Sequence, residues 1–405
     1  MNNAVYAQSG GVTSVINASA YGVMSELKKV SPDSNIYAAQ NGILGLLAGK
    51  LYDIGRTEKP LELLLESPAG MFGSCRFKLP EIDNTSFYDG LFKILDKNSI
   101  KYFFYNGGND SADTCLKVAL AAKKIGYNLC AIAIPKTIDN DLVVTDNCPG
   151  FGSVAKYVAT SVKEAALDLK SMCKTSTNIF VLEVMGRHAG WIAASAELAN
   201  VADLTHVHKI LLPEILFDEE NFLHGVERDL SKYGFCVVVA SEGLKDQTGT
   251  FYSQSIIEDS FGHKQLGGVA PKIAELISKN LKIKYHWSVS DYLQRSARHL
   301  VSKIDLEQAI EVGKVAAEYA IAGRSGVMPV IKRLSNVPYL WEVREGNLLE
   351  IANKEKIVPN KYISECGFRI RKAGTDYLQP LIQGESFPKF RDGLPIYEQL
   401  DLHLV

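Results

Sequence analysis

Residues 130–141 read CAIAIPKTIDND, an apolar run that passes through a proline into a cluster of acidic and amide side chains. The first five residues have the length and composition of a buried strand. Open α/β folds bind ligands beyond the carboxyl ends of parallel strands, so polar groups placed here favour a functional site. An ordinary turn is the alternative, because Asp and Asn often cap the element that follows.

Strand-like and helix-like segments alternate along the chain. Further apolar runs suited to buried strands lie at residues 4–7, 102–105, 179–184 and 235–240. Helical spacing is found over residues 14–29, in the segment that ends at 124, and over 153–171, 190–196, 267–281 and 305–323. This alternation predicts an α/β protein whose mainly parallel sheets are covered by helices on both faces.

The strand and helix pattern restarts near residues 145–150. We therefore expect two doubly wound, mainly parallel-sheet lobes, with the active site in the cleft between them. The expected lobes are residues 1–145 and 146–305. The remaining residues, 306–405, are expected to form a helix that returns to the first lobe and a C-terminal appendage.

Composition and charge are typical of a globular cytoplasmic enzyme. Hydrophobic residues make up 46% of the 405 residues, and the net charge is −2 without a basic run, which argues against nucleic-acid and membrane partners. No apolar stretch approaches the roughly 18 residues that span a bilayer, and the N-terminus does not resemble a signal peptide. The seven cysteines form no C-x-x-C pair and indicate reduced thiols.

Two glycine pairs directly follow predicted strands. Gly10 and Gly11 join the first strand to the first helix, where glycine lets the backbone approach a phosphate and the helix N-terminus supplies N–H groups. The second pair, Gly107 and Gly108, is followed at once by residues 109–110, Asn and Asp, whose oxygen atoms suit Mg²⁺. Each pair alone also fits a tight turn. Neither matches a Walker loop or a dinucleotide fingerprint.

A third polar segment, residues 184–190, follows the predicted strand at 179–184. Its Arg187 offers a planar fork for phosphate oxygens. A surface ion pair is the alternative for an arginine at this position. Each motif alone has low specificity for a function, so their joint order along the chain is the stronger indication of function.

Six motifs occur in sequence and together resemble the phosphofructokinase family. They are G-G-x-x-x-x-x-N at 10–17, GGNDS at 107–111, PKTIDND at 135–141, MGR at 185–187, SEG at 241–243 and YLQR at 292–295. The resemblance implies transfer of a phosphoryl group to the 1-hydroxyl of fructose 6-phosphate in glycolysis and gluconeogenesis, with Mg²⁺ as cofactor. It also implies a homodimer or higher homo-oligomer, and it makes residues 1–145 the phosphate-donor lobe and 146–305 the sugar-phosphate lobe.

Two positions decide the phosphoryl donor. ATP-using members of the family have glycine where this chain has Asp110 and Lys136. A carboxylate at 110 would repel the α-phosphate of ATP, at a cost of several kcal/mol for an effective dielectric constant of about 20. An ammonium at 136 would neutralise charge on the transferring group. The pair resembles the pyrophosphate-dependent branch; an ATP-dependent sugar-phosphate kinase of the same fold is the alternative.

The resemblance assigns a role to each matching residue. Asp139 is the candidate base for the sugar 1-hydroxyl, and Lys136 and Arg187 complete the catalytic set. Pyrophosphate binding and donor specificity fall to Gly11, Asp110, Lys136 and Arg76. Sugar-phosphate binding falls to Thr137, Ile138, Asp139, Met185, Gly186, Arg187, Glu242, Tyr292, Leu293, Gln294 and Arg295. Metal binding falls to Asn109 and Asp141.

Several residues depart from the family pattern or leave alternatives open. Asn109 stands where an aspartate usually helps to hold magnesium, and Asn178 and His286 stand where many members carry arginines that reach a neighbouring subunit's substrate. Sedoheptulose 7-phosphate is therefore an alternative acceptor. Arg298 is expected to be solvated or ion-paired rather than to bind phosphate. A non-catalytic regulatory subunit is the alternative from another class, against which the retained Asp139 argues.

Overall fold

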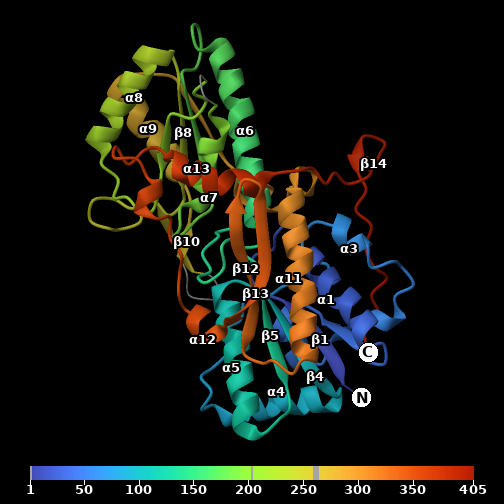
Figure 1. Ribbon diagram of the computed structural model, residues 1–405. Helices are drawn as coiled ribbons and strands as arrows, with labels where there is room; N and C mark the ends of the chain where they lie inside the picture. The colour runs from blue at the N-terminus through green and yellow to red at the C-terminus, as the bar shows by residue number, and fades with distance from the viewer. Residues whose placement is uncertain (1, 202–203, 259–263) are drawn as a thin grey trace. The chain divides into compact units, whose positions relative to one another are not determined.

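The computed structural model describes residues 2–201, 204–258 and 264–405 (Figure 1). The chain divides into two compact units, which are described separately. The first unit comprises Met1–Gly150, Ser296–Glu355 and Gly384–Val405, and the second comprises Phe151–Arg295 and Lys356–Gln383. The chain thus passes from one unit to the other at residues 150/151, 295/296, 355/356 and 383/384.

The first unit is built on a seven-stranded sheet in the order β13-β12-β5-β4-β1-β2-β3. Its strands are β1 (Asn3–Gln8), β2 (Ile36–Ala39), β3 (Leu51–Asp53), β4 (Ile100–Gly107), β5 (Cys130–Pro135), β12 (Val327–Asn336) and β13 (Tyr339–Asn347). The central strands pair in parallel, and only the outermost pairs, β2 with β3 and β12 with β13, are antiparallel. The predicted strands at 4–7, 102–105 and 130–134 are the three central ones.

Helices cover both faces of this sheet. The helices are α1 (Ile16–Val30), α2 (Gly42–Leu47), α3 (Leu63–Glu66), α4 (Thr85–Lys97), α5 (Asn109–Ile125), α11 (Lys303–Ile321) and α12 (Leu348–Ile351). Alternate residues of the central strands face two separate cores, one filled by α1 and α11 and the other by α4 and α5. Figure 1 shows α1 and α11 side by side. The doubly wound, mainly parallel architecture predicted from the sequence is confirmed.

The second unit contains a four-stranded, fully parallel sheet in the order β11-β6-β8-β7. Its strands are β6 (Ile179–Val184), β7 (Lys209–Leu211), β8 (Cys236–Ser241) and β11 (Tyr285–Val289), beside a hairpin of β9 (Gln254–Glu258) and β10 (Lys264–Leu266). Its helices are α6 (Phe151–Met172), α7 (Trp191–Ser195), α8 (Glu219–Tyr233), α9 (Val269–Leu281), α10 (Asp291–Ser296, whose last residue falls in the first unit) and α13 (Lys372–Leu378). A core between the sheet, α8 and α9 holds this unit together.

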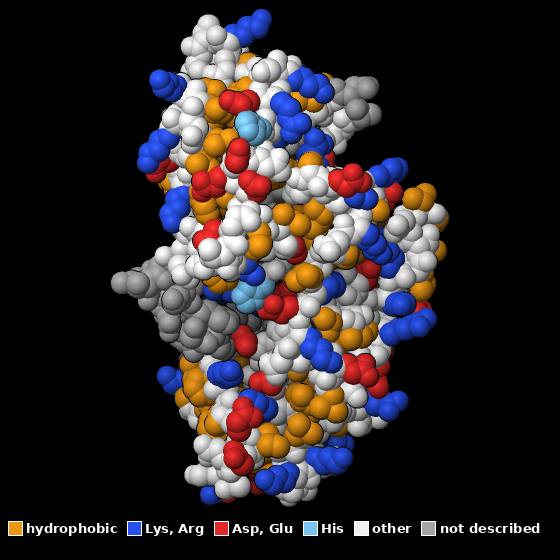
Figure 2. Space-filling model, turned by 90° about the vertical axis from the view of Figure 1, so that its left-hand side faces the viewer, with side chains coloured by type: hydrophobic (Ala, Val, Ile, Leu, Met, Phe, Trp, Pro, Cys, Tyr) orange, Lys and Arg blue, Asp and Glu red, His pale blue; other side chains and the backbone are white. Residues whose placement is uncertain are grey.

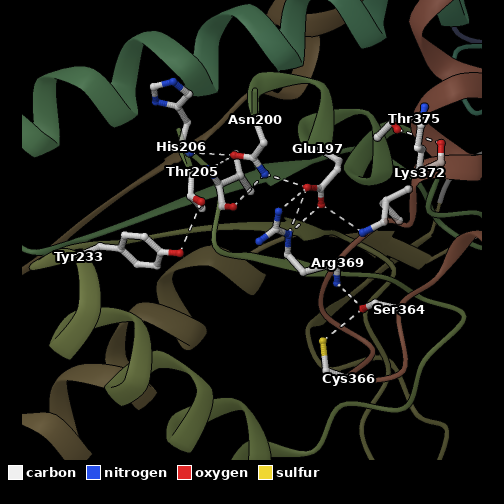
Figure 3. A network of polar contacts seen from close by, with 12 residues as sticks. Glu197, Asn200, Thr205, His206, Tyr233, Ser364, Cys366, Arg369, Lys372 and Thr375 are labelled. Carbon is white, nitrogen blue, oxygen red and sulfur yellow. Dashed lines mark hydrogen bonds and ion pairs between the residues drawn. The ribbon is translucent and has the colours of Figure 1, made fainter. Parts of the chain in front are cut away.

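The C-terminal hundred residues are distributed over both units rather than gathered in one appendage. β12 joins the first sheet because its apolar start pairs with β5 through Val327 and Ile132. Residues 356–383 pack within the second unit, where the Arg369 guanidinium donates hydrogen bonds to the buried carboxylate of Glu197 and forms an ion pair with it (Figure 3). The extreme C-terminus pairs with β3, as the His403 carbonyl accepts from Asp53 and the Val405 N–H donates to Leu51.

The surface carries mixed charges. On the face shown in Figure 2, basic and acidic side chains are interspersed with apolar ones, in keeping with the net charge of −2. Among the helices of residues 2–201, 204–258 and 264–405, none has both the length and the apolar character needed to cross a bilayer.

Candidate functional site

The first unit gathers the predicted donor residues around the end of β1. Lys136, at the end of β5, is 3% exposed, and its Nζ donates to the Ser9 carbonyl at 2.7 Å and to the Gly11 carbonyl. The ammonium therefore crosslinks the loop Ser9–Gly11 to the stretch 135–141, although 125 residues separate Lys136 from Gly11. β4 lies between β1 and β5 in the sheet, so this direct link between their ends is a finding of the structure.

The N-terminus of α5 lies beside Lys136. The Lys136 N–H donates to the Gly107 carbonyl at 3.0 Å, immediately before α5 begins. Asp110 occupies the first turn of this helix. A carboxylate there interacts favourably with the helix dipole and takes the position where a helix N-terminus otherwise attracts a phosphate. Asp110 and Lys136 thus belong to one corner of the first unit.

The acidic stretch is held in a fixed turn. The Asp139 N–H donates to Thr137 Oγ1 at 3.1 Å, and Asn140 has a left-handed φ of 53° while its Oδ1 accepts the Cys148 N–H. Asp139 is half-buried, Ile138 is buried, and the Oδ1 atom of Asp141 is inaccessible to solvent. The turn therefore places Asp139 just beyond the end of β5, and its role as the base stays a prediction.

A buried network that sequence reasoning missed supports this turn from α11. The Asp305 carboxylate accepts the Gly150 N–H at 2.9 Å, and Gln308 Oε1 accepts from Asn147 at 2.6 Å. Asp305 lies in the first turn of α11, after the N-cap Ser302. A Ser-x-x-Asp start of a helix was the available signal, but it indicates capping and does not show which loop the acid contacts.

Arg76 is exposed and lies beside the glycine loop. Ser9 forms a parallel bridge with Cys75, and the Gly10 N–H donates to the Cys75 carbonyl at 2.9 Å. Since Arg76 follows Cys75 directly, its backbone is fixed next to Gly10 and Gly11. The structure thus brings the four predicted donor residues together within the first unit.

Asn109 is engaged by main-chain atoms on both sides of its amide. Its Nδ2 donates to the Lys354 carbonyl at 2.6 Å, and its Oδ1 accepts the Asn353 N–H at 2.6 Å. An aspartate could not make the first bond, because a carboxylate has no donor. The structure therefore gives Asn109 a tethering role that explains the amide at this position.

The local chemistry fits Mg²⁺ even with Asn109 so engaged. In residues 2–201, 204–258 and 264–405, three or more His, Cys, Asp or Glu side chains nowhere gather as a metal-binding group. Magnesium usually takes one or two protein carboxylates and completes its shell with water and substrate phosphates. Asp141, two residues after the candidate base Asp139, is a carboxylate that suits that pattern.

The second unit positions its predicted residues at the ends of β6 and β8. Val184 and Ser241 are partners in these adjacent parallel strands, and Glu242 Oε1 accepts the Gly186 N–H at 3.4 Å. A side chain at position 243 is excluded, because a Cβ at Gly243 would lie 2.0 Å from the Arg187 carbonyl. The sheet thus brings Met185-Gly186-Arg187 and Glu242 together, although they are far apart in sequence.

Burial changes the chemistry of Glu242. Loss of solvation raises the pKa of its carboxyl, and the Gly186 N–H and the positive charge of Arg187 lower it in part. A carboxylate that protonates more readily than usual is a poor surface ion-pair partner. A perturbed pKa at a strand end is typical of a binding or catalytic group.

The predicted YLQR segment divides into exposed and buried positions. Tyr292 and Leu293 are 63% and 65% exposed, and the Arg295 guanidinium lies 4.0 Å from the Tyr292 ring centroid. Gln294 is buried and accepts the Met185 N–H at 3.3 Å. Gln294 therefore fixes α10 against the end of β6, whereas Tyr292 and Arg295 form a stacked pair accessible to a ligand.

Three residues singled out from the sequence have other surroundings than a phosphate site. Asn178 donates to the Cys173 and Gly234 carbonyls and so links the residues that follow α6 and α8, while His286 is exposed on the edge strand β11. The expectation that Arg298 is solvated or ion-paired is wrong.

Arg298 is 2% exposed, and its guanidinium donates to the Leu65 carbonyl and to the carbonyl and Oγ of Ser386. Burial lowers the pKa of this guanidinium. A guanidinium carries five N–H donors and can therefore bind several main-chain acceptors at once. An arginine at this position thus links the segment 384–405 to the rest of the first unit. The structure thus assigns Arg298 a structural role within the first unit.

The predicted site is distributed between the two units. Gly11, Arg76, Asn109, Asp110 and residues 136–141 belong to the first, and residues 185–187, Glu242 and residues 292–295 belong to the second. Each set is brought together within its own unit. The expectation that both sets face one cleft stays a prediction.

Comparisons with known proteins agree with the motifs. The sequence model described as phosphofructokinase matches residues 3–320. The pyrophosphate–fructose 6-phosphate 1-phosphotransferase of Halomonas elongata is 52% identical over 407 residues, which cover all of this chain and 97% of the relative. The enzyme of the same name from Methylococcus capsulatus is 52% identical and covers 98% of this chain and 96% of its own length.

A solved structure gives the same result for the fold. The crystal structure of the pyrophosphate-dependent phosphofructokinase from Nitrosospira multiformis superimposes with a TM-score of 0.93 at 49% identity, covering all of this chain and 98% of that one. The six motifs, the two α/β units and these full-length similarities lead to one conclusion: this chain belongs to the phosphofructokinase family.

Proposed function

We propose that this protein transfers a phosphoryl group reversibly from pyrophosphate to the 1-hydroxyl of fructose 6-phosphate, giving fructose 1,6-bisphosphate and phosphate. The observation that carries the proposal is the buried Lys136 ammonium, bound to the carbonyls of Ser9 and Gly11 with the carboxylate-bearing first turn of α5 beside it. These groups suit a compact, highly charged donor and disfavour a nucleotide. The names of full-length relatives support the same donor.

On the donor side, fixed positive groups neutralise the pyrophosphate charge. Gly11 offers a backbone N–H, and Arg76 and Lys136 offer cationic side chains. Phosphoryl transfer depends mainly on alignment and on stabilising charge that develops on the transferring group. The carbonyl anchors hold Lys136 in place before substrate arrives, so little reorganisation is needed during the reaction.

Asp139 is the proposed base. Its carboxylate accepts the proton of the sugar 1-hydroxyl as that oxygen forms its bond to phosphorus. The bond between this phosphorus and the bridging oxygen of pyrophosphate breaks, and phosphate leaves. Thr137, whose Oγ1 accepts the Asp139 N–H, orients the base.

On the sugar side, Arg187 contacts the transferring phosphoryl group and Glu242 accepts hydrogen bonds from sugar hydroxyls. The stacked pair of Tyr292 and Arg295 binds the 6-phosphate, with Gln294 fixing α10. Mg²⁺ would supply further charge neutralisation on the phosphates, and Asp141 is the carboxylate suited to hold it. A homodimer or higher homo-oligomer in the cytoplasm stays a prediction from the family resemblance.

A donor assay tests the proposal. The purified chain is given pyrophosphate or ATP with Mg²⁺, and fructose 6-phosphate or sedoheptulose 7-phosphate as acceptor. We expect turnover with pyrophosphate and fructose 6-phosphate in both directions, and background turnover with ATP. Robust activity with ATP and none with pyrophosphate would overturn the donor assignment. A preference for sedoheptulose 7-phosphate would overturn the acceptor assignment.

Asp139→Asn separates catalysis from mere binding. Removal of the base should lower kcat by about 10²- to 10⁴-fold while fructose 6-phosphate still binds. Asp33→Asn, at an exposed position outside the site, serves as the control and should behave as wild type. A fully active Asp139→Asn variant would exclude Asp139 as the base, and a wild-type protein that binds both substrates without turnover would support the regulatory alternative.

A further inference from the structure

The glycine loop at the end of β1 is held from two sides. Residues 74–75 contact it on one side: the Gly10 N–H donates to the Cys75 carbonyl at 2.9 Å, and Ser74 Oγ donates to the Gly10 carbonyl at 2.7 Å. Lys136 contacts it through the carbonyls of Ser9 and Gly11. Three successive carbonyls, at residues 9–11, are thus hydrogen-bonded by side chains, and Ser74 holds the middle one.

The orientation of the Gly10–Gly11 peptide determines the direction of the Gly11 N–H. A trans peptide is planar, so the carbonyl of Gly10 and the N–H of Gly11 point in opposite directions. Because Ser74 holds that carbonyl, the Gly11 N–H is directed away from Ser74. Both residues that flank this peptide are glycines, and because neither carries a Cβ, steric contacts restrict the rotation of the peptide little. The orientation of this peptide therefore depends on its hydrogen bonds.

We propose that Ser74 is a positioning residue for the phosphoryl donor: its hydroxyl fixes the Gly10–Gly11 peptide so that the Gly11 N–H is available to a donor phosphate. Ser74 itself does not contact the donor in this scheme. The inference rests on the proposed function through the contact between Gly11 and pyrophosphate. It goes further by naming the side chain that controls that contact.

The test compares Ser74→Ala with Ser74→Thr in the full chain. The hydroxyl-to-carbonyl bond is a neutral hydrogen bond, so its loss should raise the KM for pyrophosphate roughly 5- to 10-fold. The KM for fructose 6-phosphate should stay within about 2-fold of wild type, because the sugar residues Glu242 and 292–295 belong to the other unit. Threonine retains the hydroxyl and should restore the wild-type KM for pyrophosphate.

A control removes a hydroxyl that makes a hydrogen bond of the same length elsewhere. Ser171 Oγ also donates to a main-chain carbonyl, that of Asp168, at 2.7 Å on the surface of α6. Ser171→Ala should leave both KM values unchanged. If Ser74→Ala does not fold, as judged by circular dichroism, Ser74→Cys replaces it, since a thiol keeps the volume but donates weakly.

The outcomes distinguish this inference from the proposed function. An unchanged KM for pyrophosphate in Ser74→Ala, or equal rises in the KM of both substrates, would overturn the inference and leave the donor assignment intact. If the wild-type protein uses ATP instead of pyrophosphate, the donor assignment fails. The same comparison is then made with ATP as the donor, and a selective rise in its KM would still support the role of Ser74.

Discussion

The candidate site has a donor half in the first unit (Gly11, Arg76, Asp110 and Lys136) and a sugar half in the second (residues 185–187, Glu242 and residues 292–295). Hydrogen bonds crosslink the donor half before substrate binds, whereas part of the sugar half is exposed to solvent. In the first unit, Lys136 is 3% exposed and ties two strand ends together. In the second, Tyr292 is 63% exposed, and its ring stacks on the Arg295 guanidinium. The difference indicates that the donor half is preorganised for a small, highly charged group, while part of the sugar half is open to solvent.

Lys136→Met tests the preorganised half and should have the largest effect. The change removes the positive charge and leaves the Ser9 and Gly11 carbonyls without their partner. We expect kcat with pyrophosphate to fall by about 10²- to 10³-fold, by analogy with the loss of one electrostatic stabiliser. Steady-state kinetics measure it, with the exposed Lys28→Met as control. A loss below tenfold would show that the buried ammonium is mainly structural.

Glu242→Gln tests the half-buried acid of the sugar half. Loss of a hydrogen bond to a charged group should raise the KM for fructose 6-phosphate about 10- to 100-fold at neutral pH. Because burial raises the pKa of Glu242, the wild-type carboxylate takes up its proton at a higher pH than an exposed glutamate.

The wild-type KM for the sugar phosphate should therefore begin to rise, as pH falls, at a higher pH than an exposed glutamate would cause. In Glu242→Gln this pH dependence should disappear. The raised pKa also means that the ionised carboxylate costs stability above it, so the glutamine variant should be at least as stable as wild type at neutral pH. Identical pH profiles for the two proteins would exclude Glu242 from sugar binding.

Asn109→Asp sharpens the account of the donor half. The aspartate cannot donate to the Lys354 carbonyl, so the free energy of unfolding should fall by about 0.5–1.5 kcal/mol, the net contribution of a typical hydrogen bond. Denaturant unfolding measures it. The control is Asn280→Asp, whose amide donates to the Leu276 carbonyl at an exposed site and should matter less. Unchanged stability together with tighter Mg²⁺ binding would instead make position 109 a metal ligand.

Arg295→Lys tests the open half and should have the smallest effect. Lysine keeps the charge but loses the planar stack on Tyr292. An exposed cation–π contact is weak, so the KM for fructose 6-phosphate should rise only about 2- to 5-fold. Arg228→Lys on the exposed face of α8 is the control. A loss as large as that of Lys136→Met would show that the sugar half is as preorganised as the donor half.

Much of the central sheet and of the site was predictable because those signals are local. The strands at residues 4–7, 102–105 and 130–134 are uninterrupted apolar runs, as expected for parallel strands buried on both faces. The polar groups that follow them identify the carboxyl edge. The hairpin β12–β13 was missed because its buried residues are concentrated at the start of β12, whereas most of the rest is partly or fully exposed and forms no uninterrupted apolar run.

The sequence by itself determined the α/β class, the family and the donor argument. Each of these depends on the order of short motifs or on the identities of residues 110 and 136, which can be read directly from the chain. Only the tertiary structure decided what those residues touch. Lys136 binds carbonyls some 125 residues away, and Asn109 binds main-chain atoms 244 and 245 residues away. These hydrogen-bond partners are main-chain groups. Every residue carries such groups, so no pattern of side chains could have predicted which of them Lys136 and Asn109 bind.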